Sequence, residues 1–574
     1  MKIQFAVPHD LRGACDAAAV DWKTHSKVER FWKKDPGLWT SKGEENWLGW
    51  TNIVERQQKD AAAFTALAAD VKAAGFESVL LLGMGGSSLC PEVLAVTFGR
   101  QSGFPALHIV DSTDPDRIRS IQGKVDLSRT LAIVASKSGS TLEPNILKQY
   151  FFAEMQKAVG AEKAGSHFIA ITDPGSKMEQ VAKNDGFWRT FYGDPQIGGR
   201  YSALSNFGVI AATVMGLDTG KLLAEAAKAV ASAKNAPAEN PAVQLGLLLG
   251  SAHNAGRDKI TIFTSPEIYD FGAWLEQLIA ESTGKLGKGI TPVDREAPGP
   301  VEVYGKDRVF AYVRLAGTRD TVHDKAVAEL EAAGHPVARI EIEDLYEIFG
   351  QFFLWEIATA VAGSVMGINP FDQPDVEAAK VEARGLTTEY EKTGKLPDRK
   401  PIFDSGSVEI FASDAYAKEL KLEGTGASLE TYLRTHFANI KEGDYVAILA
   451  FLPMFAEYEN TIQEFRHRIR DKKHVATCMG FGPRFLHSTG QDYKGGPNTG
   501  VFLQITGDHP EDLAIPGQKY TFGVVIDAQA AGDLAVLESR GRRALRLHLK
   551  GDVGTGLDTV RAAVDAALRD EAIR

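Results

Sequence analysis

Two stretches rich in glycine and hydroxyl residues have the composition of phosphate-binding loops. "LLLGMGGSSLCPEVL" (residues 80–94) passes from an apolar run into glycines and serines, and then into a helical pattern. "VASKSGSTLEPNIL" (residues 134–147) repeats this order and carries four hydroxyl side chains within its loop. A loop that joins a strand to a helix brings backbone N–H groups and the positive end of the helix dipole to one point, which favours an anion.

The first loop is compatible with three interpretations. Gly83 and Gly85 after a strand, with Asp111 ending the next strand, are compatible with the pyrophosphate of a dinucleotide, but Ser88 replaces the third glycine of that fingerprint. A tight turn without a ligand is the second interpretation, and the single phosphate of a small metabolite is the third.

The second loop favours a monophosphate. Helix capping by Ser140 or Thr141 requires only one hydroxyl, whereas this loop offers four. We therefore expect both loops to hold one phosphate group. The substrate-binding residues expected in them are Gly86, Ser87, Ser136, Lys137, Ser138 and Thr141.

Five motifs along the chain resemble those of the phosphoglucose isomerase family, which is built from sugar-isomerase domains. They are "GMGGSS", "SKSGSTLEP", "GGRYSALSNFG" (198–208), "WLEQLIAESTGKLGKG" (274–289) and "GINPFDQPDVEAAK" (367–380). The resemblance covers residues 80–380. The remainder resembles the isomerase part of bacterial transaldolase–phosphoglucose isomerase fusions. A transaldolase barrel needs about 250 further residues, and we expect none in the stretch before Leu80.

The resemblance implies interconversion of glucose 6-phosphate and fructose 6-phosphate through an enediolate, in glycolysis and gluconeogenesis. This chemistry needs a base that reaches two carbons, a cation for the oxyanion, and an acid/base pair that opens the sugar ring, but no metal and no cofactor. The family motifs place the base at Glu281 and the enediolate-stabilising arginine at Arg200. They place a ring-opening lysine at Lys380, with Gln373 in the same signature. Glu276, by contrast, is expected to be a solvated helix residue.

The histidine departs from the family pattern. Between the glutamate motif and the last signature the chain has only His323 and His335, and neither has the family's sequence context. "FLHSTGQDYKGG" (residues 485–496) instead resembles the bacterial isomerase motif LHSxGQ. The resemblance therefore implies that His487 takes the ring-opening role from a third domain that closes on the first two. An ordinary loop histidine is the alternative.

The elements that would position these residues follow from apolar periodicity. Short apolar runs that alternate with helices are typical of a parallel sheet covered on both faces. The predicted strands are "SVLLLG", "ALHIVD", "LAIVAS" and "FIAITD" in a first unit, "KITIFTS", "RVFAYVRL" and "PVARIEI" in a second, and "YVAILAFL", "HVATCMG", "GVFLQIT" and "TFGVVIDA" in a third.

We predict an α/β protein with two doubly wound, sugar-isomerase-type parallel-sheet domains and a third, C-terminal α/β domain. The expected divisions are an N-terminal helical segment (1–55), a first domain (56–235), a second domain (236–383), a linker or flap (384–406) and the third domain (407–574). The prolines of "NAPAENP" indicate the first junction, and the polar stretch after residue 383 indicates the linker.

Composition narrows the class of protein. A net charge of −11 argues against a nucleic-acid or anionic-membrane partner. Three cysteines without a CxxC pair are too few for a disulfide framework or a structural zinc site. The apolar stretch 349–367 carries Glu356 and is predicted to be a buried core helix. The N-terminus lacks the apolar segment of a secretory signal, so we expect a cytoplasmic protein.

Two other functions are compatible with the same loops. A sugar-phosphate-sensing module would bind without turnover, and an NAD-linked oxidoreductase would use the glycines and Asp111. Tolerance for mannose 6-phosphate is open, because the residues that would read its differing hydroxyl are not identifiable. Family members are usually dimeric, so the resemblance implies a homodimer unless the third domain replaces that contact.

Overall fold

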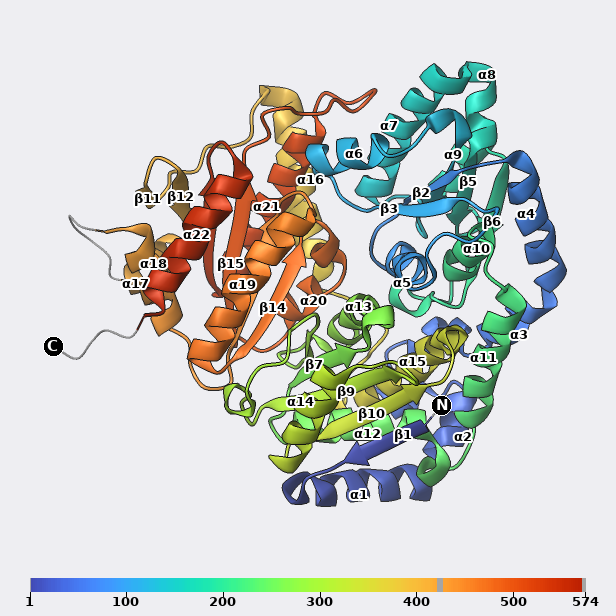
Figure 1. Ribbon diagram of the computed structural model, residues 1–574, viewed down its shortest axis with the longest axis vertical. Coiled ribbons are helices and arrows are strands. Elements are labelled where there is room, and N and C mark those ends of the chain that lie inside the picture. Colours follow the sequence, from blue (N-terminus) through green and yellow to red (C-terminus); the bar gives the residue numbers. More distant parts are fainter. Residues whose placement is uncertain (1, 421–426, 570–574) are drawn as a thin grey trace.

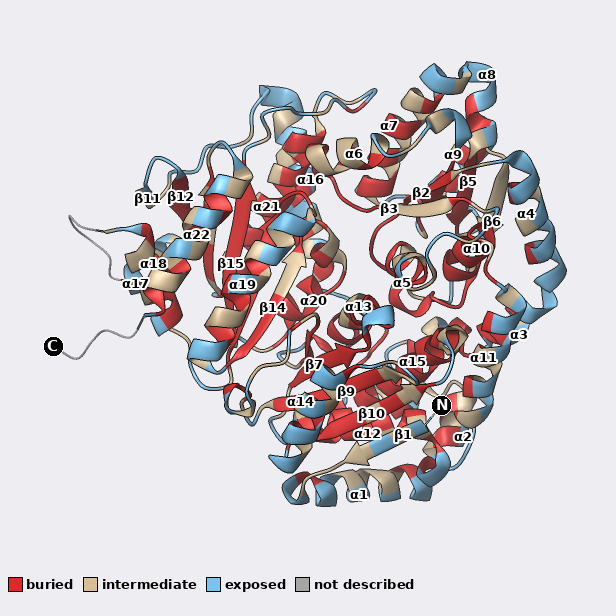
Figure 2. Ribbon diagram, viewed as in Figure 1, coloured by how far each residue is buried: buried red, intermediate tan, exposed pale blue. Residues whose placement is uncertain are grey.

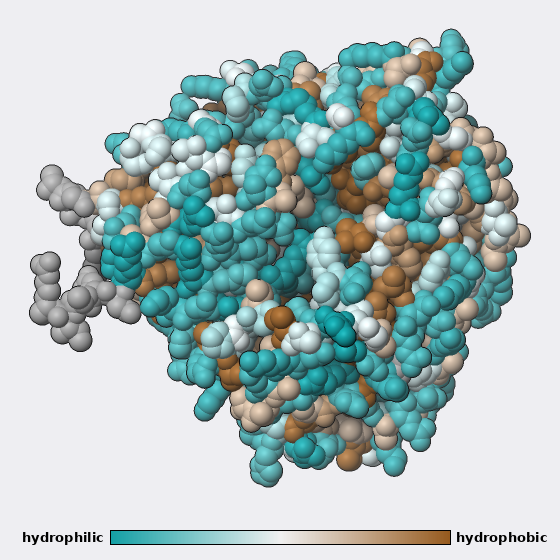
Figure 3. Space-filling view, in the orientation of Figure 1, coloured by the Kyte–Doolittle hydropathy of each residue, from teal (hydrophilic) through white to brown (hydrophobic). Residues whose placement is uncertain are grey.

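Alternating apolar strands and helices build three sheets, each with a parallel core (Figure 1). The computed structural model describes residues 2–420 and 427–569. The central strands of all three sheets are buried (Figure 2). Edge strands such as β1 (Lys2–Ala6) and β3 (Ala106–Val110) are partly or fully exposed, as are the outward faces of helices such as α1 (His9–Thr24) and α4 (Ala61–Ala74). Hydrophilic residues cover most of the face seen in Figure 3, with smaller apolar areas between them. Each domain thus buries its apolar strands beneath polar helix faces.

The first sheet is wholly parallel, with the strand order β3-β2-β4-β5-β6. Its strands are β2 (Ser78–Leu82), β3 (Ala106–Val110), β4 (Thr130–Ala135), β5 (Phe168–Thr172) and β6 (Arg189–Tyr192). Its other helices are α5 (Leu89–Phe98), α6 (Pro115–Gln122), α7 (Leu142–Val159), α8 (Ala161–Ala164), α9 (Lys177–Asn184), α10 (Asn206–Val214) and α11 (Thr219–Ser232). From β2 the chain first adds β3 on one side and then β4 on the other. The strand order therefore reverses at β2, where ligands of doubly wound sheets bind.

The second sheet has the order β1-β10-β9-β7-β8. Its parallel strands are β7 (Lys259–Thr264), β8 (Thr291–Val293), β9 (Arg308–Leu315) and β10 (Val337–Ile342). Its helices are α12 (Pro241–Asn254), α13 (Phe271–Thr283), α14 (Thr321–Ala332) and α15 (Ile348–Met366). Among the described residues, one stretch, Leu345–Met366, is long and apolar enough to span a membrane, and 89% of its most apolar window is buried.

The sequence analysis predicted a helical N-terminal segment, but this segment begins with a strand. β1 (Lys2–Ala6) pairs antiparallel with β10 at the edge of the second sheet, and Phe5 lies opposite Ala338. Helices α1, α2 (Lys27–Trp32) and α3 (Ile53–Lys59) follow it. Five residues are too short for a strand period to stand out, and the open edge of β10 supplies the hydrogen bonds. The segment therefore belongs structurally to the second domain.

The third sheet has the order β11-β12-β16-β15-β13-β14. Its strands are β11 (Phe403–Asp404), β12 (Val408–Phe411), β13 (Tyr445–Phe451), β14 (Ala476–Phe481), β15 (Gly500–Gly507) and β16 (Arg543–Leu549). Its helices are α17 (Asp414–Leu420), α18 (Leu429–Ala438), α19 (Ala456–Lys473), α20 (Gly490–Gly495), α21 (Phe522–Ser539) and α22 (Val553–Ala567). The strands β13 to β16 are parallel, and β12 runs against β16.

Two predictions about this region were wrong. "TFGVVIDA" is not a strand but the start of α21, where the Thr521 side chain accepts a hydrogen bond from Val524 N–H. Its apolar residues are buried on several sides, and such a run resembles a buried strand. The predicted linker is helical up to Thr393, because α16 (Val376–Thr393) packs against α21 through residues such as Ala383. Its polar residues are the exposed face of that helix.

The three domains share hydrophobic cores. Ile515, Phe522 and Val525 of the third domain are buried in the core on one face of the first sheet. Val293, at the end of β8, is buried in a core of the third domain. Segments far apart in sequence thus exclude water together, and separating the domains would expose apolar surface, which is unfavourable. The third domain therefore packs on the other two through shared apolar cores.

Candidate active site

A cavity of about 450 Å³ lies where the three domains meet. It collects side chains and loops from all three domains. Among its lining residues are Gly85, Gly86, Ser87, Ser136, Lys137, Ser138, Thr141, Gln277, Glu281, Gln373, Glu377, Lys380 and His487. Every candidate site residue from the sequence except Arg200 is in this set. The loops after β2 and β4 enter it at the carboxyl ends of adjacent strands, as the strand order requires.

The glycine loop after β2 allows two other loops to come close. A side-chain carbon at Gly86 would lie 2.0 Å from the carbonyl oxygen of Gly199. Gly85 has a positive φ of 57°, and a side-chain carbon there would lie 3.0 Å from Cβ of His487. Only glycine permits both approaches. The loop therefore holds the neighbouring loops in place as well as facing the cavity.

The loop after β4 presents hydroxyl groups that helix capping does not use. The Ser136 hydroxyl is buried and has no hydrogen-bond partner within the described part of the chain. Thr141 stands at the N-cap of α7, yet its side chain makes no capping hydrogen bond with the described residues. The Ser138 and Ser140 hydroxyls are 2.9 Å apart. This arrangement can accept a phosphate at the N-terminus of α7.

Lys137 differs from its neighbours because its ammonium group is already engaged. Nζ forms an ion pair with Asp173 and donates to the carbonyl oxygen of Asp194 at 2.9 Å. Burial raises the pKa of Asp173 above its usual value, although Lys137 works in the opposite direction. The lysine thus lines the cavity with its charge already paired.

Glu281 lies near the end of α13 with both carboxylate oxygens held. Oε1 accepts a hydrogen bond from Arg200 Nη1 at 3.1 Å, and Oε2 accepts one from Gln277 Nε2 at 3.0 Å. Gln277 Nε2 also donates to the carbonyl oxygen of His487 at 2.9 Å, so one amide connects the glutamate with the histidine segment. The side-chain oxygen of Gln277, Oε1, is buried without a partner among the described residues. It can accept a hydrogen bond from a substrate hydroxyl.

Arg200 is outside the set of residues that line the cavity. Its side chain is 1% exposed, and all five guanidinium N–H groups are used. They donate to Ser282 Oγ (2.8 Å), Glu281 Oε1 (3.1 Å), Gln373 Oε1 (2.9 Å) and the carbonyl oxygens of Pro370 (2.8 Å) and Asp372 (2.9 Å). The arginine thus orients Glu281 and fixes the loop that carries Gln373.

Lys285 also holds the loop that carries Gln373. Its Nζ donates to the carbonyl oxygen of Asn369 at 2.7 Å and to Asp372 Oδ1 at 2.6 Å. Burial and the nearby Arg200 charge lower the pKa of Lys285 to about 8. Two buried cations therefore hold the residue 369–373 loop beside the base.

His487 forms a hydrogen bond with a glutamate of the first domain. Its Nε2 is 3.0 Å from Glu143 Oε1, which also accepts from Gln529 Nε2 at 2.7 Å. The side-chain oxygen of Gln529, Oε1, in turn accepts a hydrogen bond from the Thr113 hydroxyl at 2.7 Å. Burial raises the pKa of Glu143, but the neighbouring His487 and Lys380 outweigh it and lower this pKa below its usual value. The pair is therefore an imidazole beside an ionised carboxylate.

Sequence reasoning missed Glu143 and Gln277 as site residues. Glu143 stands directly after the hydroxyl loop, in the first turn of α7, where acidic residues are common. Gln277 precedes Glu281 by four residues, the spacing that places two side chains on one helix face. That spacing was the available signal for Gln277. The partner of Glu143 lies more than 300 residues away, so no local signal could have indicated it.

Lys380 lies on α16 at the edge of the cavity. Its Nζ is 3.2 Å from Glu377 Oε1, and its side chain is partly exposed. The start of α16 is held by Gln491, whose Oε1 accepts from the N–H groups of Asp375 and Val376 at 3.0 and 3.1 Å. The segment that carries His487 therefore also positions the helix that carries Lys380.

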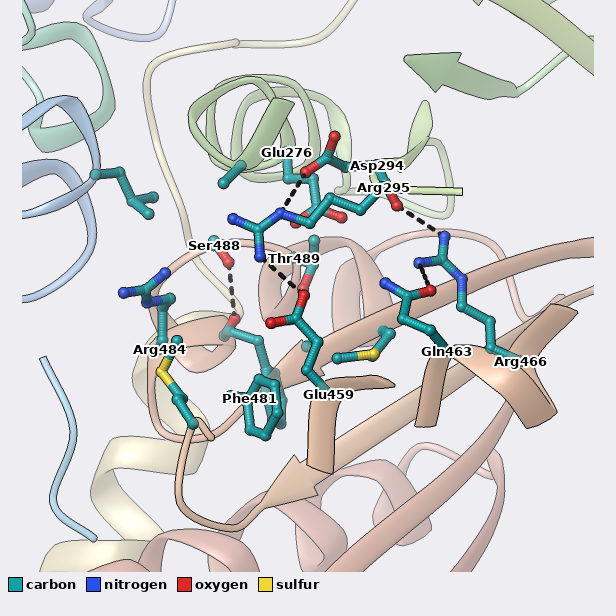
Figure 4. Close-up of a pocket in the computed structure, with 16 residues that line it drawn as sticks. Glu276, Asp294, Arg295, Glu459, Gln463, Arg466, Phe481, Arg484, Ser488 and Thr489 are labelled. Atoms are coloured by element: carbon teal, nitrogen blue, oxygen red, sulfur yellow. Dashed lines mark hydrogen bonds and ion pairs between the residues drawn. The ribbon is translucent and has the colours of Figure 1, made fainter. Parts of the chain in front are cut away.

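Glu276 is not the solvated residue that the sequence suggested. It lines a second, smaller cavity of about 60 Å³ at the same domain junction, together with Asp294, Arg295 and Glu459 (Figure 4). Burial and the Asp294 charge raise the pKa of Glu276 to about 8. Arg295 is paired with Asp270 and, at 3.1 Å, with Glu459. The helix face opposite the base thus packs into a charged domain interface.

Asp111 is already committed to contacts within the protein. Its Oδ1 accepts from Arg484 Nη2 at 2.9 Å, and its Oδ2 accepts from the Ser88 hydroxyl at 3.1 Å. The carboxylate that a dinucleotide would need for its ribose is therefore occupied. Within residues 2–420 and 427–569, no group of three or more His, Cys, Asp or Glu side chains is arranged to hold a metal ion.

Comparisons with known proteins agree with this geometry. A family model described as phosphoglucose isomerase matches residues 66–299, which include both loops, Arg200 and Glu281. A glucose-6-phosphate isomerase of Rubrobacter xylanophilus is 30% identical over 57% of this chain and 86% of its own length. A probable glucose-6-phosphate isomerase of Methanococcus maripaludis is 28% identical over 54% of this chain and 79% of its own length.

Two solved structures share the fold. A hypothetical protein from Thermus thermophilus has a TM-score of 0.58 at 23% identity, covering 67% of this chain and 99% of its own. A glucose-6-phosphate isomerase from Chlamydia trachomatis has a TM-score of 0.52 at 22% identity, covering 60% and 75%. The predicted α/β fold class is confirmed by these likenesses and by the three parallel-cored sheets.

Proposed function

The chain belongs to the phosphoglucose isomerase family, and we propose that it interconverts glucose 6-phosphate and fructose 6-phosphate by moving a proton between C1 and C2 through an enediolate. The observation that carries this proposal is the meeting of Glu281, the His487–Glu143 pair and the hydroxyl loop at one cavity. These groups supply a base, a ring-opening acid and a phosphate-binding loop.

Ring opening is assigned to His487 with Lys380. An ionised carboxylate only accepts hydrogen bonds, so the contact with Glu143 places a proton on His487 Nε2. The other ring nitrogen, Nδ1, is then the atom that exchanges a proton with the sugar. The Lys380 ammonium, at the edge of the same cavity, favours negative charge developing on the ring oxygen.

Proton transfer between the carbons is assigned to Glu281. Its carboxylate is held by Arg200 and Gln277, so it is oriented before substrate arrives. Arg200 reaches the enediolate oxygen by exchanging one donor. We assign this to Nη1, whose partner Gln373 is exposed and can move aside at little cost. The arginine then stabilises the oxyanion and keeps its other contacts.

Phosphate recognition is assigned to the loop after β4. The unpartnered Ser136 hydroxyl and the N–H groups at the start of α7 provide donors to the phosphate oxygens. Gly86 and Ser87 of the glycine loop line the same cavity. The phosphate thereby fixes the distance of C1 and C2 from Glu281.

The direct test is turnover by purified protein. Fructose 6-phosphate is supplied, and glucose 6-phosphate formation is followed with a coupled dehydrogenase. Conversion well above background is expected, and its absence would leave the sensing module as the better assignment. Calorimetry with a non-isomerisable sugar phosphate would then report binding without turnover. The same assay with mannose 6-phosphate measures epimer tolerance.

A cytoplasmic location, a homodimer and a relation to transaldolase fusions remain predictions of the sequence.

A further inference from the structure

Arg484 connects the histidine segment of the third domain to the first domain. It begins the short helical turn Arg484–His487 and lies three residues before His487. Its guanidinium donates to Glu92 through Nη1 at 2.6 Å and Nη2 at 2.8 Å. It also contacts Asp111 through Nη2 at 2.9 Å and Nε at 2.8 Å. One arginine thus bridges two carboxylates across the domain boundary. It forms a two-point fork with Glu92, and with Asp111 it forms one hydrogen bond and a close Nε contact.

Both carboxylates adjoin the glycine loop of the candidate active site. Glu92 lies in the first turn of α5, directly after that loop. Asp111 follows β3 and also holds the Ser88 hydroxyl at the end of the loop. The loop itself contacts the histidine segment at Gly85. A continuous set of contacts therefore leads from the histidine turn through Arg484 to the loop.

The burial of this cluster makes its geometry restrictive. The side chains of Arg484, Glu92 and Asp111 are 12%, 15% and 3% exposed. Two carboxylates this close repel each other unless a cation lies between them, and water screens them little at such burial. A guanidinium presents its donors in a rigid plane, whereas an ammonium group acts as a point charge. Arginine therefore fixes orientation as well as charge.

Arg484 turns away from the second cavity. Figure 4 shows its guanidinium directed away from the Arg295–Glu459 pair, although Arg484 is among the residues that line this cavity. Its contacts lie on the side of the glycine loop.

We propose that Arg484 is a positioning residue that holds the His487 imidazole at the ring oxygen of the substrate through its fork with Glu92 and its ion pair with Asp111. This inference rests on the isomerase function proposed above. The imidazole is otherwise anchored by Glu143 at its ring and by Gln277 at its backbone. Without the contacts of Arg484 the turn Arg484–His487 can shift slightly. Such a shift is enough to move the His487 imidazole out of line with the ring oxygen of the substrate.

The test separates ring opening from proton abstraction. Fructose 6-phosphate must be ring-opened, whereas its 5-deoxy analogue lacks the hydroxyl that closes the furanose ring and is always open. For Arg484→Lys we expect kcat/KM for fructose 6-phosphate to fall by about 10- to 100-fold, since small misplacements can cost about 100-fold. Exchange of the C1 hydrogen of the analogue with deuterated water, followed by NMR, should stay within twofold.

Arg470→Lys is the matched control. Arg470 is also a buried arginine of the third domain that reaches the second domain, and it is outside the lining of the active-site cavity. Both rates should stay near wild type in this variant. If Arg484→Lys does not fold, Glu92→Gln is the second variant. It disrupts the two-point contact with Glu92 and keeps the contact with Asp111. The same selective loss of fructose 6-phosphate turnover is expected, but a smaller one.

Two results would overturn the inference. An equal loss of both reactions would indicate general damage, and no loss in either would show that the fork is dispensable. A wild-type protein that performs neither reaction would refute the proposed function itself, so the two failures are distinguishable.

Discussion

Replacing Glu143 by glutamine should weaken ring opening without weakening proton abstraction. Glutamine keeps an oxygen that can accept from both His487 and Gln529, so the hydrogen bonds seen at 3.0 and 2.7 Å can persist. What disappears is the negative charge beside the imidazole. The effect should therefore fall on steps in which His487 carries a positive charge.

The magnitude follows from the contact. A hydrogen bond to a charged group contributes about 1.5–3 kcal/mol and a neutral one about 0.5–1.5 kcal/mol. The difference between the two is about 1–2 kcal/mol. It should apply in full here, since the Glu143 side chain is 5% exposed and little screened by water. At about 1.4 kcal/mol for each tenfold change in rate, turnover of fructose 6-phosphate should fall by about 5- to 30-fold.

The assay compares two substrates and two variants. Coupled turnover of fructose 6-phosphate reports ring opening and isomerisation together, and C1 exchange on the 5-deoxy analogue reports proton abstraction alone. Glu154→Gln, on the same helix but paired with Lys157 near the surface, should change neither rate. The reasoning is refuted if Glu143→Gln lowers turnover less than twofold, or slows exchange as strongly as turnover.

Three further predictions concern the base, the phosphate loop and a histidine of the third domain. Glu281→Gln should lower kcat at least about 100-fold, since general bases contribute about 10²–10⁴-fold, with analogue binding by calorimetry nearly intact; a tenth of wild-type rate would exclude it as the base. Ser136→Ala with Thr141→Ala should chiefly raise KM, at about 1.5–3 kcal/mol for each lost bond to a charged group; an unchanged KM would contradict phosphate binding. Burial lowers the pKa of His509, but the hydrogen bond and charge of Asp527 raise it above its usual value. This contribution to stability is complete below about pH 6.5 and is lost as pH rises through the folded pKa. The melting temperature should therefore fall as pH rises above about 6.5, and a slope unchanged in Asp527→Asn would contradict this.

Local sequence determined the central strands and the loops of the two doubly wound sheets, although β1, β6 and β8 were not predicted. β2 and β4 are short, continuous apolar runs that end in glycine or hydroxyl residues, a pattern typical of a buried parallel strand followed by a polar turn. The hydroxyl loop and Glu281 were therefore readable as candidates from neighbouring residues. Their nearest determinants lie within a few residues of them.

Local sequence was insufficient where burial comes from another domain. The start of α21 is apolar on several sides because Phe522 and Val525 enter the core of the first domain. Periodicity then fits strand and helix equally. The polar face of α16 looked like a linker for the same reason, since its buried face is covered by α21.

Only the tertiary structure decided how the charged groups of the site are paired. Arg200 could be matched to a motif, but its five acceptors come from segments up to 173 residues away. Glu143 and His487 are 344 residues apart, and Arg484 is 392 residues from Glu92. A charged side chain is stable in a buried site only when partners satisfy it. Which partners are available depends on how the domains pack, and the spacing of residues along the chain does not contain that information.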